Sequence, residues 1–159
     1  MRSTSFRALT LLLAASFVTA CGGSDDDAAV QTVDRTAELE EWVDAAEEHA
    51  EDKDRRGLLS MISENYADGR GNDREKVGNI MRAYFLRQES VALLTTIDDI
   101  EMMGDDAALV NLTVGMAGTN ANGPGVRAHA YNFELELENP GDEWVLIGAR
   151  WGRVGRDMK

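Results

Sequence analysis

Cysteine and histidine are almost absent from this chain. Its 159 residues include one cysteine, Cys21, and two histidines, His49 and His129. An internal disulfide needs two cysteines, and a zinc site with four Cys or His ligands needs more of these residues than the chain has. Both are excluded, and we expect no metal and no cofactor.

Positive charge is also scarce. The chain has 16 Lys and Arg residues against 29 Asp and Glu residues, so its net charge is −13. Nucleic acid is a polyanion that binds proteins mainly through Lys and Arg, so we do not expect it as a partner. Hydrophobic residues make up 43% and charged residues 28%, which is typical of one ordinary globular domain.

The common catalytic motifs are missing as well. There is no Gly-x-Ser-x-Gly elbow, no phosphate-binding Gly-Lys-Ser/Thr loop, no dinucleotide fingerprint and no Cys-x-x-Cys pair. Hydrolase, kinase and redox functions therefore have no positive support in the sequence.

The first twenty residues have the organisation of a secretion signal. Arg2 and Arg7 precede an uncharged run over 8–20 that is rich in leucine. A helix of that run is about 20 Å long at 1.5 Å per residue, too short to cross a hydrocarbon core of about 30 Å. We therefore predict a cleaved signal over 1–20 and no permanent anchor in it.

The segment Val18-Thr19-Ala20-Cys21 resembles the lipobox of bacterial lipoproteins. The resemblance implies that the Cys21 thiol receives a diacylglycerol, that the signal is cut before Cys21, and that the new amino group is acylated. Several acyl chains attach a protein firmly, so we expect the membrane as a partner. Loss of Arg2 and Arg7 with the signal changes the net charge from −13 to −15.

The residue after Cys21 is Gly22 and not aspartate. This resembles the pattern of lipoproteins that proceed to the outer membrane of Gram-negative bacteria. We expect a lipid-anchored location in the bacterial envelope, facing the periplasm from the outer membrane in a Gram-negative host. Residues 21–35 are small, acidic and without a period, and they predict a flexible tether.

Helical spacing of apolar residues marks the next part of the chain. An acidic amphipathic helix is expected over 36–50, a second helix over 54–69 with Asp54 as its cap, and a third over 72–88 with Asn72 as its cap. After Ser90 the apolar period changes to two. Four strands are expected over 91–103, 110–116, 127–137 and 144–151, with a hairpin loop over 118–125.

The first of these strands changes parity at Asp98-Asp99, which predicts a bulge or sharp bend. Three helices followed by an antiparallel meander predict an α+β fold with the helices on one face of a four-stranded sheet.

The order of elements, the runs Tyr66-Ala67-Asp68 and Ala83-Tyr84-Phe85, the bent first strand and the pair Trp144 and Trp151 resemble the nuclear transport factor 2-like superfamily. This superfamily includes SnoaL-like polyketide cyclases and ketosteroid isomerase. The resemblance covers residues 36–154 and leaves a tail over 155–159. It implies a cone-shaped domain with a pocket at its open end, and in many members a homodimer formed through the outer face of the sheet.

Enzymes of this superfamily place a carboxylate and a proton donor in the apolar cone. His129 is a candidate general base with Tyr131 or Tyr84 as hydrogen-bond donor; the alternative is a rim histidine beside a core tyrosine. Asp68 is a candidate pocket acid, or else it binds backbone N–H groups in a turn. No catalytic residue is assigned. The pocket candidates are Tyr66, Tyr84, Asp98, His129, Tyr131, Arg150 and Trp151.

Three functions follow from this resemblance. We expect a binding module for a small apolar ligand or a partner protein. The alternatives are an assembly domain whose outer face bears Trp144 and Leu146, and a metal-independent isomerase, dehydratase or cyclase. Convergence of Asp68, Tyr84 and His129 on one cavity would favour the enzyme.

Overall fold

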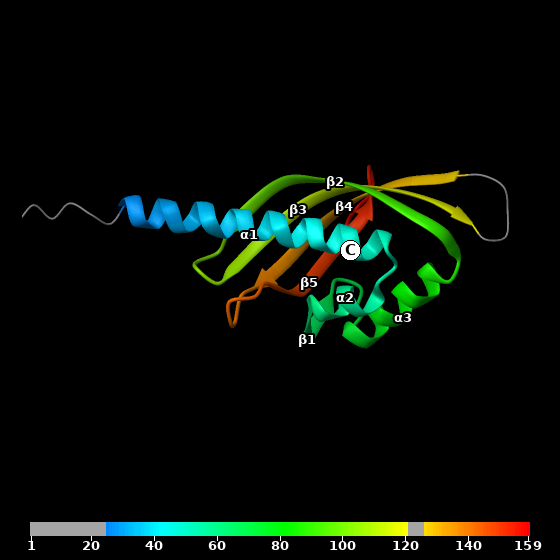
Figure 1. Cartoon of the computed structure of the whole chain (residues 1–159), viewed down its shortest axis with the longest axis horizontal. Coiled ribbons are helices and arrows are strands. Elements are labelled where there is room, and N and C mark those ends of the chain that lie inside the picture. The colour runs from blue at the N-terminus through cyan, green and yellow to red at the C-terminus, as the bar shows by residue number, and fades with distance from the viewer. Residues whose placement is uncertain (1–24, 121–125) are drawn as a thin grey trace, which may run out of the picture.

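The structure is a computed structural model that describes residues 25–120 and 126–159 (Figure 1). The predicted signal, Cys21 and the tip of the predicted loop lie outside the described residues. The elements in chain order are α1 (Asp25–Glu51), α2 (Arg55–Ser60), β1 (Ile62–Asp68), α3 (Arg74–Phe85), β2 (Gln88–Met102), β3 (Ala107–Asn120), β4 (Val126–Glu138) and β5 (Val145–Arg153).

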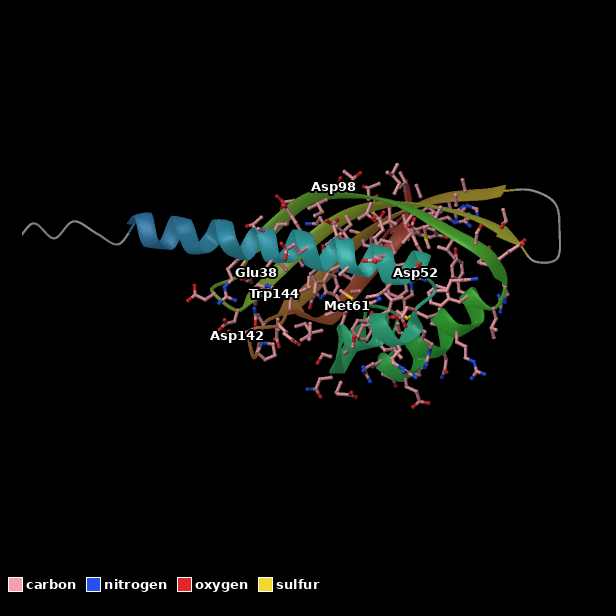
Figure 2. The ribbon with its side chains drawn as sticks, viewed as in Figure 1. Glu38, Asp52, Met61, Asp98, Asp142 and Trp144 are labelled. Carbon is pink, nitrogen blue, oxygen red and sulfur yellow. The ribbon has the colours of Figure 1, made fainter. Side chains whose placement is uncertain are left out.

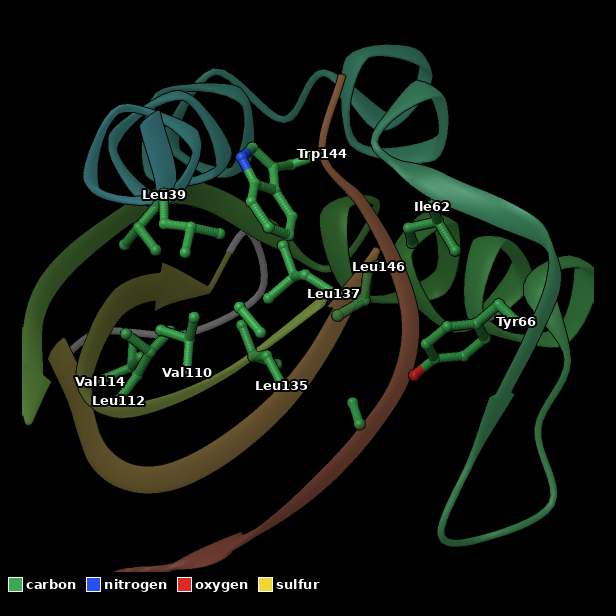
Figure 3. Packing of buried hydrophobic residues seen from close by; sticks show 13 residues of the cluster. Leu39, Ile62, Tyr66, Val110, Leu112, Val114, Leu135, Leu137, Trp144 and Leu146 are labelled. Atoms are coloured by element: carbon green, nitrogen blue, oxygen red, sulfur yellow. The ribbon is translucent and has the colours of Figure 1, made fainter. Parts of the chain in front are cut away.

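One curved sheet carries the fold, and the helices lie on its concave face (Figures 1 and 3). The strand order is β1-β5-β4-β3-β2. β1 runs parallel to β5, and the other neighbours are antiparallel. The predicted α+β class is confirmed, but the sheet has five strands and not four.

The fifth strand replaces most of the predicted second helix. Asp54 caps α2 as expected, accepting hydrogen bonds from the backbone N–H groups of Arg56 and Gly57, but α2 ends at Ser60. Ile62 and Tyr66 are both buried in β1. A spacing of four residues places side chains on one face of a helix and also on one face of a strand, and pairing with β5 decides for the strand.

Two helix starts also differ from the predictions. α1 begins at Asp25 and not at residue 36, so the predicted flexible tether is helical from Asp25 onward. Alanine, which occurs at positions 28 and 29, has the highest intrinsic helix propensity. α3 is capped by Asp73, whose carboxylate accepts from the N–H of Lys76, and not by Asn72.

The predicted bend in the first long strand is confirmed. Pairing between β2 and β3 shifts register between Ile97 and Asp99. An extra residue on one strand moves the next side chains to the other face, so Ile97 and Ile100 both pack against the core.

The core lies between α1 and the concave face of the sheet (Figure 3). Leu39 of α1, Val110 of β3 and Leu137 of β4 are its most deeply buried large side chains. On β4 the expected alternation holds, since Leu135 and Leu137 are buried between glutamates on the outer face.

Trp144 and Leu146 belong to this core, so their prediction as outer-face residues was wrong. Leu137 pairs with Leu146, whereas Glu136 pairs with Gly148. Ile147 is therefore an extra residue on β5 and reverses the parity of the strand. Trp144 and Leu146 point inward before this bulge, and Ala149 and Trp151 point inward after it.

The last residues of the chain cover the free edge of β5. Trp151 and Lys159 exchange two backbone hydrogen bonds, each 3.2 Å long. β1 has already ended at Asp68, so this tail continues the edge where β1 stops. No helix in the described ranges is long and apolar enough to cross a membrane.

Candidate aromatic site

An aromatic row crosses the concave face at one end of the sheet, and we define it as His129, Tyr131, Phe133 and Trp151. The first three are successive inward residues of β4, and Trp151 of β5 pairs with Phe133. Adjacent ring centroids lie 6.5, 6.4 and 6.3 Å apart, and the rings of Phe133 and Trp151 are stacked. Tyr131, Phe133 and Trp151 are half-buried, whereas His129 is exposed.

Two arginines lie against this row. The guanidinium carbon of Arg70 is 4.4 Å from the centroid of Trp151, and its Nη2 donates to the Trp151 carbonyl at 3.0 Å. The guanidinium carbon of Arg153 is 6.0 Å from the centroid of Tyr131, the residue that pairs with it across the strands. Both distances are in the range of cation–π attraction.

Tyr84 approaches the row from α3. Burial raises the pKa of the Tyr84 phenol, and the nearby Tyr131 phenol raises it further. The Tyr84 hydroxyl is therefore protonated at neutral pH and can donate a hydrogen bond. His129 and Tyr84 thus both lie near Tyr131.

Asp68 does not join the row. It is 8% exposed, and its carboxylate accepts from the N–H groups of Arg70 and Asn72 and from the Asn72 side chain, each at 2.8 Å. The alternative in which Asp68 holds a turn is therefore confirmed. Among the described residues, no hydrogen bond joins Asp68, Tyr84 and His129.

Tyr66 lies near Asp68 and belongs to the hydrophobic core. It is 4% exposed, and burial raises its pKa far above the ordinary value, with a smaller contribution from the Asp68 charge. Tyr66 is therefore a neutral core residue.

Two pocket candidates lie on the opposite face of the sheet. Asp98 is exposed at the β2 bulge and accepts from the Thr113 hydroxyl at 2.8 Å (Figure 2). Arg150 forms an ion pair with Glu134 on the outer face. Neither side chain therefore lies on the concave face: Asp98 is the extra residue at the β2 bulge, and Arg150 lies opposite Glu134 on β4.

A shallow hollow of about 490 Å³ opens on the sheet near His129. Its lining comes only from β2, β3 and β4. Two outward rows, Ala92-Ala117-Ala128 and Leu94-Gly115-Ala130, flank the row of Leu93, Met116 and His129. Since no helix residue lines it, we place the hollow on the outer face.

Sequence reasoning missed three parts of this geometry. The hollow arises because the outward positions around Leu94 on three neighbouring strands are alanine or glycine, a signal that appears only once the register is known. Arg70 and Arg153 were not among the pocket candidates, since a turn and a strand end give no pattern for their placement. No group of three or more His, Cys, Asp or Glu that could hold a metal occurs in the described ranges.

No protein-family model and no curated protein matches the chain. Solved structures do match. The hexachlorocyclohexane dehydrochlorinase LinA-type3 from Novosphingobium barchaimii aligns with a TM-score of 0.68 at 12% identity, covering 82% of this chain and 92% of that one. An NTF-2 like protein of unknown function from Shewanella oneidensis aligns with a TM-score of 0.59 at 17% identity, covering 72% and 96%.

The chain has the NTF2-like fold. A ketosteroid isomerase-like protein from Erwinia carotovora atroseptica shares it, with a TM-score of 0.63 at 13% identity over 76% of this chain and 96% of that one. The predicted superfamily fold is thus confirmed. These identities establish the NTF2-like fold alone, because this scaffold supports many functions.

Proposed function

We propose that this NTF2-like protein is a lipid-anchored protein of the bacterial envelope that holds a small apolar ligand on its aromatic row. Cys21 carries the lipid in this proposal, and no catalysis is assumed. The observation that carries the ligand is the row itself: three half-buried rings lie side by side on the concave face. Flat apolar ligands stack well on such rings.

The enzyme alternative has lost one of its three candidate groups. His129 and Tyr84 remain near Tyr131, but the Asp68 carboxylate is occupied by the turn at 2.8 Å. A proton-transfer reaction needs a base within hydrogen-bond reach of its substrate, and His129 alone can serve on this row. Binding requires only the rings, so it is the function that the geometry supports best.

Native mass spectrometry of the mature chain from its own host tests the proposal. We expect the wild type to retain a small molecule, and Trp151→Leu, which keeps an apolar side chain but loses the flat ring, to release it. A second measurement adds the neutral probe 2-naphthamide to residues 21–159 carrying Cys21→Ser. This form includes every contact described above. If the wild type shows only the mass of the protein itself, and 2-naphthamide does not bind, the ligand part of the proposal is wrong.

A second candidate is self-association through the outer face. Leu94 is 74% exposed, and around it the outward side chains of the hollow are alanine or glycine. A protruding leucine beside a shallow apolar hollow is self-complementary under a two-fold axis. This surface replaces the predicted one, because Trp144 and Leu146 are in the core.

Leu94→Glu tests this candidate by light scattering after gel filtration. We expect the wild type to be a dimer and the variant a monomer. Leu86→Glu is the matched control, since Leu86 at the end of α3 is also 74% exposed. A monomeric wild type, or equal effects of the two substitutions, would refute association through the hollow.

A further inference from the structure

Arg153 is an exposed arginine that forms no ion pair with the described residues of this strongly acidic chain. Three other arginines have carboxylate partners: Arg35 with Asp106, Arg74 with Glu64, and Arg150 with Glu134. Arg153 has no carboxylate within 4.0 Å among the described residues, and the same holds for Arg55, Arg56, Arg70, Arg82, Arg87 and Arg156. Arg153 differs from these in lying at the aromatic row without a side-chain hydrogen bond to any described residue, its guanidinium carbon 6.0 Å from the Tyr131 ring centroid.

The surroundings of Arg153 suit a ligand with one anionic end. A guanidinium can donate two parallel hydrogen bonds to a carboxylate. The protonated Tyr84 hydroxyl lies close enough to Tyr131 for the two phenols to influence each other, so a further donor is near the same ring. The stacked rings of Phe133 and Trp151 continue from Tyr131 and offer an apolar surface.

Arg70 supports the apolar end of this arrangement. Its guanidinium covers the Trp151 ring at 4.4 Å and is tied to the Trp151 carbonyl at 3.0 Å. The turn that carries Arg70 is held by the buried Asp68 carboxylate. Arg70 therefore fixes the position of the ring, whereas Arg153, without a hydrogen-bond partner among the described residues, can receive the anion.

We propose that the aromatic row binds an organic carboxylate with a flat apolar body, its carboxylate on Arg153 and its body against the exposed parts of the Tyr131 and Phe133 rings. This inference rests on the proposed function and names the class of its ligand. It requires no covalent step and no co-reactant.

Two probes that share one ring system test the proposal. 2-Naphthoate carries a carboxylate, whereas 2-naphthamide is its neutral counterpart of similar shape. Titration calorimetry on residues 21–159 with Cys21→Ser should show tighter binding of the naphthoate. In Arg153→Gln we expect naphthoate binding to weaken about tenfold or more, and naphthamide binding to stay unchanged, because only the charged hydrogen bonds are lost.

Arg150→Gln is the matched control. It removes the same charge from the same strand, but Arg150 lies on the outer face with Glu134. We expect it to change neither affinity by more than about twofold, within the small effect of a screened distant charge. Arg153→Lys keeps the charge but not the planar fork, and should restore part of the naphthoate affinity.

The outcomes separate the two proposals. Equal binding of both probes by the wild type overturns the carboxylate inference and leaves the apolar ligand in place. An unchanged preference for naphthoate in Arg153→Gln, or an equal loss in Arg150→Gln, also overturns it. Binding of neither probe removes the proposed function itself. Naphthamide affinity in each variant shows whether the row is still folded.

Discussion

At the scale of single residues, Gly152 shows how one missing side chain positions a segment. A Cβ at this position would lie 2.7 Å from the Asp157 carbonyl oxygen and 3.2 Å from the Met158 Cα. These are backbone atoms and cannot rotate away. Glycine at this place therefore lets the tail lie against β5, where Lys159 pairs with Trp151.

We expect Gly152→Ala to lower the free energy of unfolding by about 1–3 kcal/mol, the usual cost of forcing extra volume into a packed place. Urea unfolding measures it, and hydrogen exchange should show faster exchange at the Trp151 amide. A chain that ends at Gly155 lacks the clashing atoms, so the same substitution should cost almost nothing there. An equal cost in both chains would show that the tail is not its cause.

Asp54 gives a pH-dependent contribution at the same scale. Its pKa is lowered, first by the hydrogen bond from the Gly57 N–H and also by the nearby His49. A carboxylate with a lowered folded pKa stabilises the fold above its ordinary value of about 3.9, and this contribution is lost as pH falls through the folded value. The contribution should be present at pH 7 and vanish in strong acid.

Asp54→Asn isolates this effect, because asparagine also caps helices but does not titrate there. Thermal unfolding of both chains at several pH values should show the wild type more stable at neutral pH, with the difference shrinking below about pH 3.9. A difference independent of pH would contradict the charge-based explanation.

At the scale of elements, two tryptophans fasten α1 to the sheet. The Trp144 Nε1 donates to the Glu38 carboxylate at 3.0 Å, and the Trp42 Nε1 donates to the Trp144 carbonyl at 3.0 Å (Figure 2). Arg35 also lies 5.9 Å from the Trp144 ring centroid. These two hydrogen bonds join α1 to the start of β5, across a sequence separation of more than one hundred residues.

Trp144→Phe keeps an apolar ring but removes the donor to Glu38. We expect it to lower the free energy of unfolding by about 1–3 kcal/mol, since hydrogen bonds to charged groups contribute about 1.5–3 kcal/mol. Urea unfolding of Trp144→Phe, Glu38→Ala and the double variant gives the coupling between the two residues. Strictly additive effects would mean that the hydrogen bond does not stabilise the fold.

The sequence predicted an element correctly where its apolar residues fit only one period, either that of a helix or that of a strand. β4 alternates glutamates with buried leucines over several residues, and only a strand explains that pattern. β1 was missed because Ile62 and Tyr66 fit both periods. Its strand conformation depends on pairing with β5, which lies far away in sequence.

The candidate site was predicted only in part, for a related reason. His129 and Tyr131 were correctly assigned to one inward face, because β4 has no bulge between them. Trp144 and Leu146 were assigned to the wrong face because the bulge at Ile147 reverses the parity of β5, and no residue type marks that bulge. Register depends on pairing between strands, so local pattern alone does not determine it.

At the scale of the whole molecule, α1 contacts both ends of the curved sheet. Arg35 contacts Asp106 in the turn between β2 and β3, at 3.7 Å. Glu51, at the end of the same helix, accepts from the Leu93 N–H at 2.7 Å, in the row that includes His129. At 1.5 Å per residue these contacts lie about 24 Å apart along the helix. The aromatic end of the sheet is therefore the end away from the start of α1 (Figure 1).

This arrangement predicts an orientation for the proposed lipid anchor at Cys21. Because α1 is helical from Asp25, we expect it to act as a rigid spacer, and we expect an anionic surface to repel this acidic chain. A fluorophore on Asp106→Cys should transfer energy strongly to an acceptor among the headgroups of anionic vesicles, and one on Glu89→Cys weakly. Each introduced cysteine is the only free thiol when Cys21 is lipidated.

Gln31→Pro breaks the helix and should reduce the difference in energy transfer between the two labelled sites. Equal transfer from both sites in the unbroken chain would show that α1 does not hold the aromatic row away from the membrane.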